Sequence, residues 1–248
     1  MVFHPYNKPL KQKITIKMCK KAISEKDHIK YLGIMIDSTL TCKTHIDNIS
    51  IKISRAVGLL YKIRPFVNIK TMRTLYYSLA YPHLIYAIEI WGSADITHLN
   101  RLLMLQKRIL RLITFSDKRR EDFSLPSTDP LFRKMEIHKI HDVFKLKVSK
   151  FIFNCLNKTN PVQFHNWYLL TSQVHLHNTR SKYVDIDNAI STRTLFIPTA
   201  RTTYYGLKSL KVQGTKIWNQ LPATLRIYDS FYSFNKEIKR IFIDSYNF

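Results

Sequence analysis

The sequence predicts a mainly α-helical protein with a small N-terminal β-hairpin, α+β overall. In residues 14–18, apolar and polar side chains alternate as in a two-faced strand, and residues 29–36 form its natural partner strand. From Ile46 onward, apolar residues recur every three or four positions, the period of a helix that buries one face. The chain has 248 residues, of which 45% are hydrophobic, enough for one large domain or two small ones.

Charge limits the choice of partner. The chain carries 40 Lys and Arg against 17 Asp and Glu, a formal net charge of +23. A folded chain this basic is expected to bind a polyanion, nucleic acid first and an anionic membrane surface second. The three cysteines, Cys19, Cys42 and Cys155, are odd in number and far apart. They fit a reducing, intracellular compartment, with nucleus and cytoplasm not distinguished.

Residues 30–37, KYLGIMID, are predicted to form one core strand, because their large and β-branched apolar side chains suit a half-buried sheet. Gly33 lies inside the run, where a glycine indicates a β-bulge or a close backbone approach. A polar turn follows at residues 38–43. Two or three such strands are marginally stable alone. We therefore expect this sheet to be the edge of something larger, supplied by a missing segment or a partner.

The first helix is predicted at residues 46–66, where Pro65 ends it. Lys52, Arg55 and Lys62 fall together on a face away from the apolar stripe. Such a row can follow the phosphates of a nucleic acid, although an ordinary solvated face has the same pattern.

Residues 71–92 are the most apolar stretch and raise the question of a membrane span. The stretch contains Pro82, His83 and Glu89 and is barely long enough to cross a bilayer. Proline removes a backbone donor and crowds the preceding turn. We expect a buried helix pair broken near Pro82, and no membrane partner.

Another helix is predicted at residues 96–115, with Asp95 or Ser93 as its N-cap. Gln106 lies among the apolar positions and is expected to form hydrogen bonds inside the bundle. Helices of this kind form a compact bundle with short connections. The basic residues on the other side of this helix are Arg101, Lys107, Arg108 and Arg111.

The remainder predicts a helical C-terminal extension. Residues 116–130 are charged and contain proline, as a linker does. His138 and His141 are expected on a solvated helix face. Further helices are predicted at 131–156, 160–170, 207–221 and 230–246.

A metal site is weakly indicated. Cys155, His165, His175 and His177 are the ligand types that zinc prefers, but their spacing matches none of the usual short-loop patterns. We expect no metal site from them.

Three blocks, taken in order, resemble the C-terminal part of the reverse transcriptases of LINE-type, jockey-like non-LTR retrotransposons. The first is KYLGIMIDSTLTCKTHI at 30–46. The second is LYYSLAYPHLIYAIEIWGSA at 75–94, followed by LNRLLMLQKRILRLI at 99–113. The third combines HNTRSKY at 177–183, ARTTYYGLKSLKVQGTKIWNQLP at 200–222 and SFNKEIKRIF at 233–242.

The resemblance implies a palm edge with the primer grip at 1–43, a thumb bundle at 44–118 and a C-terminal extension at 119–248. It gives Tyr31, Leu32 and Gly33 the role of gripping the primer end. It also places basic thumb residues along an RNA or DNA template–primer duplex, which agrees with the charge argument. These residues are Lys52, Arg55, Lys62, Arg101, Lys107, Arg108 and Arg111.

The sequence departs from this family at the catalytic carboxylates, which hold two magnesium ions in these polymerases. No Asp-Asp pair occurs in the chain; Asp185 with Asp187, and Glu121 with Asp122, are the nearest approximations. We therefore expect a C-terminal fragment that is inactive alone, with no catalytic residues, no magnesium or other cofactor, and no small-molecule substrate of its own.

Two other interpretations remain open. A stand-alone basic helical module could bind single strands by stacking bases on Tyr204, Tyr205 and Trp218, although core packing is the favoured role for these aromatics. A membrane-associated helical protein would depend on residues 75–91.

Overall fold

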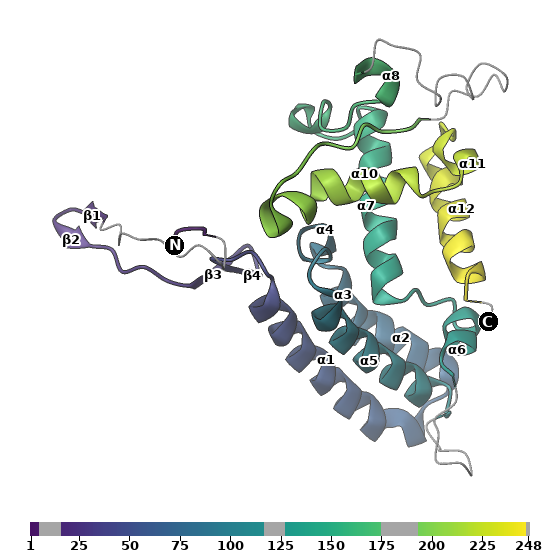
Figure 1. Cartoon of the computed structure of the whole chain (residues 1–248). Coiled ribbons are helices and arrows are strands. Elements are labelled where there is room, and N and C mark those ends of the chain that lie inside the picture. The colour runs from purple at the N-terminus through teal and green to yellow at the C-terminus, as the bar shows by residue number, and fades with distance from the viewer. Residues whose placement is uncertain (5–15, 117–126, 175–192, 247–248) are drawn as a thin grey trace.

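The computed structural model describes residues 1–4, 16–116, 127–174 and 193–246. A body of helices carries a narrow N-terminal arm that projects from one side (Figure 1). The described strands form two small antiparallel pairs, both in this arm. The predicted fold class, mainly α with a small N-terminal β-hairpin, is confirmed.

The arm contains two hairpins rather than the one strand pair expected. β1 (Lys17–Met18) pairs with β2 (Lys21–Ala22), and β3 (His28–Tyr31) pairs with β4 (Ile34–Asp37). Residues 14 and 15 lie outside the described residues. For the rest of the predicted strand, the prediction of pairing with residues 29–36 was wrong, because β1 pairs with β2 instead.

The prediction of a single strand at residues 30–37 was also wrong. Tyr31 pairs with Ile34, which leaves Leu32 and Gly33 as a two-residue turn. Their φ angles are 44° and 83°, and positive φ at both central residues is typical of the type I′ turn that closes tight hairpins. Gly33 therefore supplies a turn and not a bulge.

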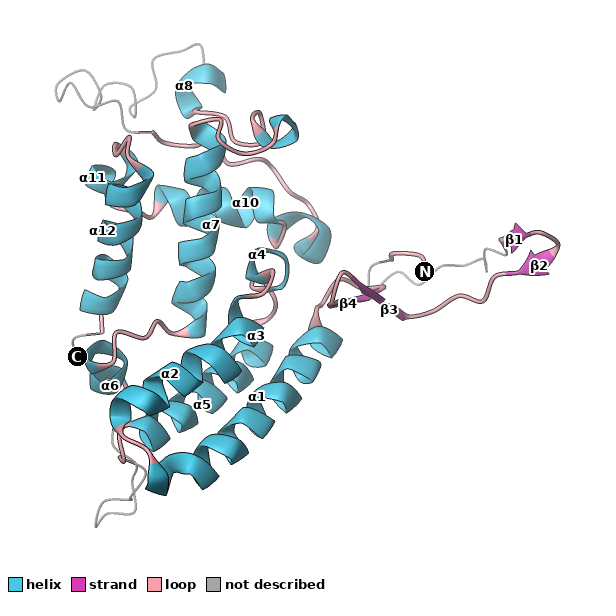
Figure 2. Ribbon diagram, turned by 180° about the vertical axis from the view of Figure 1, so that it is seen from behind, coloured by secondary structure: helices cyan, strands magenta, loops and turns pink. Residues whose placement is uncertain are grey.

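The bundle, α1 to α5, follows the arm (Figure 2). The predicted break near Pro82 is confirmed: α2 ends at Leu79, and Pro82 lies in the first turn of α3, where a missing N–H group costs little. Among the described residues, no helix is long and apolar enough to cross a membrane. The elements are α1 (Lys43–Ile63), the short 3₁₀ helix η1 (Arg64–Phe66), α2 (Ile69–Leu79), α3 (Tyr81–Ile85), α4 (Ile88–Trp91) and α5 (Ile96–Ile113).

The C-terminal part packs on the bundle through α7 (Figure 1). Helix α12 packs on α7, where the rings of Phe153 and Phe234 stack with centroids 4.7 Å apart. Trp218 is fully buried, so its predicted core role is confirmed. The elements are α6 (Asp129–Lys134), α7 (Ile140–Leu156), η2 (Val162–Phe164), α8 (Thr171–Val174), the π-helical turn η3 (Thr203–Leu207), α10 (Leu210–Asn219), α11 (Ala223–Arg226) and α12 (Phe231–Asp244).

The predicted helix at 131–156 is instead two helices, because the chain breaks between α6 and α7. Glu136 adopts a left-handed φ of 52°, which a continuing helix does not allow. The expectation of solvated histidines was wrong as well. His138 and His141 are half-buried, and their Nε2 atoms lie 3.2 Å from the Lys239 carbonyl oxygen and 3.1 Å from Asn100 Oδ1, respectively.

The predicted hydrogen bonding of Gln106 inside the bundle is confirmed, and its bonds satisfy backbone groups at the break between α6 and α7. Its fully buried amide donates to Tyr76 Oη at 3.0 Å and to the His138 carbonyl at 2.7 Å. Its Oε1 accepts from the N–H group of Ile140 at 3.0 Å. One side chain of α5 therefore binds α2, the break and the start of α7.

We predict that Gln106→Leu lowers the free energy of unfolding by about 2–4 kcal/mol, because the buried groups it serves lose their partner. Urea unfolding measures the change. Gln220→Leu, at an exposed position, is the control and should change stability by less than about 0.5 kcal/mol. A loss at position 106 no larger than that of the control would contradict the role assigned to the amide.

Candidate nucleic-acid interface

The turn between the hairpin and α1 is organised by Asp37. Its carboxylate accepts hydrogen bonds from the backbone N–H groups of Thr41 and Cys42, both at 2.9 Å, and from the hydroxyls of Thr39 and Thr41. Cys42, the N-cap of α1, has a left-handed φ of 58° and makes no side-chain cap. Asp37 therefore binds the amide of the N-cap residue and the amide just before it, and so fixes the chain where it enters α1.

These hydrogen bonds also set the charge state of Asp37. Burial alone would raise its pKa, but the donors from Thr41, Cys42 and Thr39 outweigh burial and hold the pKa below its usual value. The carboxylate is therefore ionised at neutral pH, and it stabilises the junction in that form.

Two further contacts attach the hairpin to the bundle. Tyr86, between α3 and α4, donates its hydroxyl to the Leu32 carbonyl at 2.6 Å. The N–H group of Met35 donates to Nδ1 of His45, in the first turn of α1, at 3.3 Å. The turn and strand β4 are thus each held by a side chain of the bundle.

The residues expected to grip a primer lie at the tip of this hairpin. Tyr31 is 61% exposed and Leu32 is 72% exposed, and Gly33 is exposed beside them. Large apolar side chains this exposed are available for contact with a ligand. Their role in holding a primer stays a prediction.

A pocket of about 360 Å³ lies between the hairpin and α1. Three cations from two elements surround it: Lys30 from β3, and Lys52 and Arg55 from α1. The amide of Asn48 adds a neutral hydrogen-bonding group. We call this the basic pocket; its lining residues are Lys30, Gly33, Met35, His45, Asn48, Ile49, Ile51, Lys52 and Arg55.

Lys30 is the site residue that the sequence argument missed. In the hairpin register Lys30 pairs with Met35, and both line the basic pocket. The signal was the Leu32–Gly33 turn: once that turn is recognised, the pairing follows from the two-residue loop.

The predicted basic residues of α1 are exposed as a group. Lys52, Arg55 and Lys62 all lie on the solvent side of the helix, and none forms an ion pair with a residue in the described part of the chain. Their charges therefore remain available to an external anion.

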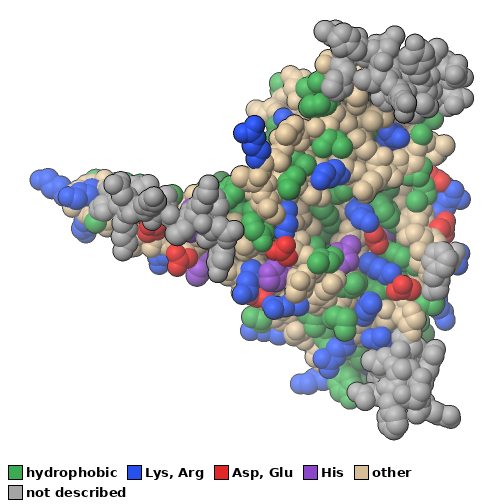
Figure 3. Space-filling model, in the orientation of Figure 1, with side chains coloured by type: hydrophobic (Ala, Val, Ile, Leu, Met, Phe, Trp, Pro, Cys, Tyr) green, Lys and Arg blue, Asp and Glu red, His purple; other side chains and the backbone are tan. Residues whose placement is uncertain are grey.

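The predicted basic residues of α5 are in a different situation. Arg101 pairs with Asp47 of α1 at 2.8 Å, so its charge is already engaged in joining the two helices. Arg108 is exposed, whereas Lys107 and Arg111 are half-buried. Figure 3 shows Lys and Arg side chains spread over the viewed face of the molecule and at the end of the arm.

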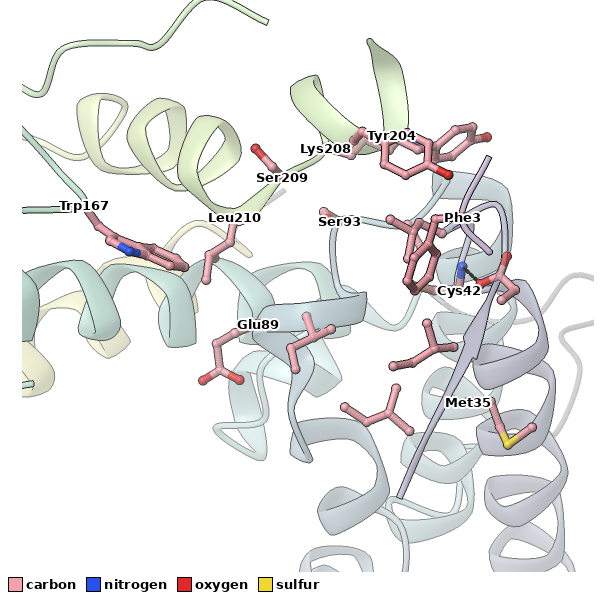
Figure 4. A pocket seen from close by; sticks show the side chains of 17 residues that line it. Phe3, Met35, Cys42, Glu89, Ser93, Trp167, Tyr204, Lys208, Ser209 and Leu210 are labelled. Atoms are coloured by element: carbon pink, nitrogen blue, oxygen red, sulfur yellow. Dashed lines mark hydrogen bonds between the residues drawn. The ribbon is translucent and has the colours of Figure 1, made fainter. Parts of the chain in front are cut away.

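A second, mainly apolar pocket of about 460 Å³ lies where the hairpin, α4 and the C-terminal part meet (Figure 4). Tyr204 donates its hydroxyl to Asp95 Oδ2 at 2.7 Å, and the ammonium group of Lys208 pairs with the same carboxylate. Asp95 is the N-cap residue of α5, one of the two predicted, but its side chain makes no capping hydrogen bond. Tyr205 donates to the Ser38 carbonyl at 3.2 Å, so η3 braces the base of the hairpin.

The described residues do not fit the magnesium pair of a polymerase. In the described ranges, no three His, Cys, Asp or Glu side chains gather closely enough to hold a metal ion. Cys155 is buried with Asn160 Nδ2 donating to its sulfur at 3.2 Å, and His165 Nε2 lies 2.6 Å from the Asn160 carbonyl oxygen. The candidates outside the described residues are His175, His177, Asp185, Asp187, Glu121 and Asp122.

Curated proteins match part of the chain. It is 31% identical over 88 residues to "Probable RNA-directed DNA polymerase from transposon X-element" of Drosophila melanogaster, 34% of this chain and 10% of that protein. It is 30% identical over 95 residues to "RNA-directed DNA polymerase from mobile element jockey" of Drosophila funebris, 37% of this chain and 10% of the relative. The protein of the same description from Drosophila melanogaster is 35% identical over 89 residues, which are 34% of this chain and 10% of that protein.

These matches confirm the predicted resemblance to jockey-like non-LTR retrotransposon polymerases over about a third of the chain. The matched region spans about a tenth of the relatives' own length. No protein-family model matches the chain. No solved structure matches it either.

We predict that Asp37→Asn lowers the free energy of unfolding at pH 7 by about 1–2 kcal/mol, because an amide keeps only one acceptor oxygen. The folded pKa lies below the unfolded value of about 3.9, so ionised Asp37 stabilises the fold above about pH 4. This contribution is lost as pH falls through the folded pKa, and the difference between the variant and the wild type should then shrink. Urea unfolding from pH 7 to pH 3 measures it, with Glu25→Gln on the exposed arm as control. A difference that does not change with pH would contradict the assignment.

Proposed function

We propose that this chain binds the backbone of a template–primer duplex, as the C-terminal part of a non-LTR retrotransposon RNA-directed DNA polymerase. The supporting observation is the basic pocket, where Lys30, Lys52 and Arg55 come together beside an exposed hairpin tip without ion-pair partners in the described part of the chain. Polymerase relatives that match about a third of the chain are consistent with it.

The geometry of α1 supports a phosphate-binding role. Lys52 and Lys62 are ten residues apart, so at about 1.5 Å per residue they span about 15 Å of helix. Phosphates of one strand advance about 3.4 Å along a duplex axis, so the row can cover roughly four of them. Contacts of this type bind any sequence, as a polymerase requires.

In this proposal the hairpin tip approaches the end of one strand. Tyr31 and Leu32 offer apolar contact to sugar and base, and the cations of the basic pocket neutralise nearby phosphates. The role assigned to the chain is binding and placement of the duplex, and not transfer of nucleotides. Two of its carboxylates in the described ranges, Asp47 and Asp95, engage basic or hydroxyl partners instead.

We predict that Lys52→Gln combined with Arg55→Gln weakens binding to a labelled primer–template duplex and reduces the slope of log K against log salt by about 2, one for each phosphate contact. Fluorescence anisotropy across a salt series measures both quantities. The charge-matched control is Lys211→Gln with Lys236→Gln, two exposed lysines of α10 and α12. Its slope should change by less than half as much.

Equal effects of the two double variants would contradict a specific interface on α1 and indicate attraction by net charge alone. Preference for single strands over duplex would favour a stand-alone module instead. Nucleotide incorporation by the purified chain with magnesium would contradict the proposed division between binding and catalysis.

A further inference from the structure

We infer that Tyr86 is a positioning residue of this interface: its hydroxyl holds the hairpin turn so that Lys30 faces Lys52 and Arg55 across the basic pocket. The inference deepens the proposed function and rests on it. Tyr86 is not among the residues that line the pocket, so its effect must pass through the hairpin.

The hairpin needs outside support. Each of its strands has four residues, β3 is exposed throughout, and Ile34 alone is buried among the residues of β3 and β4. A two-stranded hairpin of this size is at best marginally stable in water. The place of Lys30 therefore depends on contacts between the hairpin and the bundle.

Tyr86 contacts the hairpin at its turn. Its hydroxyl donates to the Leu32 carbonyl at 2.6 Å, a short and well-formed hydrogen bond. Its ring also lies against Gly33: a Cβ at that glycine would be 3.3 Å from Tyr86 Cε1. The absent side chain and the positive φ of Gly33 together let the turn approach the ring.

Tyr86 is itself held in place by the bundle. It ends α3 with an extended backbone, and Ala87 follows with a left-handed φ of 48°. The indole N–H group of Trp91, a fully buried residue, donates to the Tyr86 carbonyl at 2.8 Å. The break between α3 and α4 is thus fixed in the conformation that presents the tyrosine to the hairpin.

The same tryptophan connects Tyr86 to the second anchor of the hairpin. The Trp91 ring meets the His45 ring edge-on, with centroids 5.6 Å apart, and His45 Nδ1 accepts from the N–H group of Met35. Burial and the nearby charge of Lys52 lower the pKa of His45 to about 4, so the ring is neutral at physiological pH and its Nδ1 can accept.

His45 and Tyr86 together fix the position of the hairpin side of the basic pocket. His45 holds β4 at Met35, the cross-strand partner of Lys30, and Tyr86 holds the turn that joins the strands. With the turn released, β3 can move relative to the contacts that remain at β4 and at the base of the hairpin, and the ammonium group of Lys30 moves relative to α1. We therefore expect Tyr86 to act on the contribution of Lys30 to binding.

The test is a double-mutant cycle on duplex binding with Tyr86→Phe and Lys30→Gln. The first variant keeps the ring and removes the hydroxyl. Each single variant should weaken binding by about threefold to tenfold and reduce the salt slope by up to about one. The double variant should bind no more weakly than about the weaker single variant, because both changes remove the same contact.

Tyr77→Phe is the matched control. Tyr77 is an exposed tyrosine on α2 whose hydroxyl also donates to a backbone carbonyl, that of Glu136, at 3.5 Å. Its removal should leave duplex affinity unchanged. Hydrogen exchange of the Met35 amide, which donates to His45, measured without nucleic acid, should be faster in Tyr86→Phe than in the control.

The outcomes separate this inference from the function it rests on. Two outcomes would overturn the positioning role and leave duplex binding in place. One is that the losses of the two single variants add in the double variant. The other is that Tyr86→Phe keeps wild-type affinity while Lys30→Gln clearly loses affinity. Wild-type affinity in Lys30→Gln and in the Lys52 and Arg55 double variant would overturn the interface itself, and the positioning role with it.

Discussion

The arrangement of the helices depends on the buried amide of Gln106. It lies in the apolar stripe of α5, yet it serves Tyr76, the His138 carbonyl and the Ile140 N–H group. The break before α7 leaves backbone groups without helical partners in a dry environment, where each would be costly. A single side chain that satisfies them sets both the point at which α7 begins and the way in which the C-terminal part docks on the bundle.

Elements decided by local chemistry were predictable, and elements decided by distant contacts were not. The apolar period located α1 and α5, and Pro82 located the end of α2, because period and proline act within a few residues. The turn at Leu32 was missed because leucine rarely adopts a positive φ. The break before α7 was missed because the apolar period continues through it, and its stabilising partner lies on another helix.

The candidate site divides in the same way. Lys52 and Arg55 follow from helical spacing, whereas Lys30 reaches the basic pocket only through the register of the hairpin. Arg101 was predicted to lie along the same duplex-binding surface, yet it pairs with Asp47, which comes 54 residues earlier in the chain. Sequence spacing assigns residues to a face of one helix but does not say what another helix places opposite.

The anchors of the hairpin are unevenly distributed, and this explains why one hydroxyl can have a large effect. Asp37 fixes the junction with α1, and Tyr205 of η3 braces Ser38 across 167 positions of sequence. Both contacts hold the base, and the contact at the turn comes from Tyr86. The hairpin is held at its base, at Met35 by His45 and at its turn by Tyr86, so loss of the Tyr86 hydroxyl acts directly on the turn and on the residues beside it. The exposed tip and the cation of β3 therefore depend on a tyrosine that does not itself line the basic pocket.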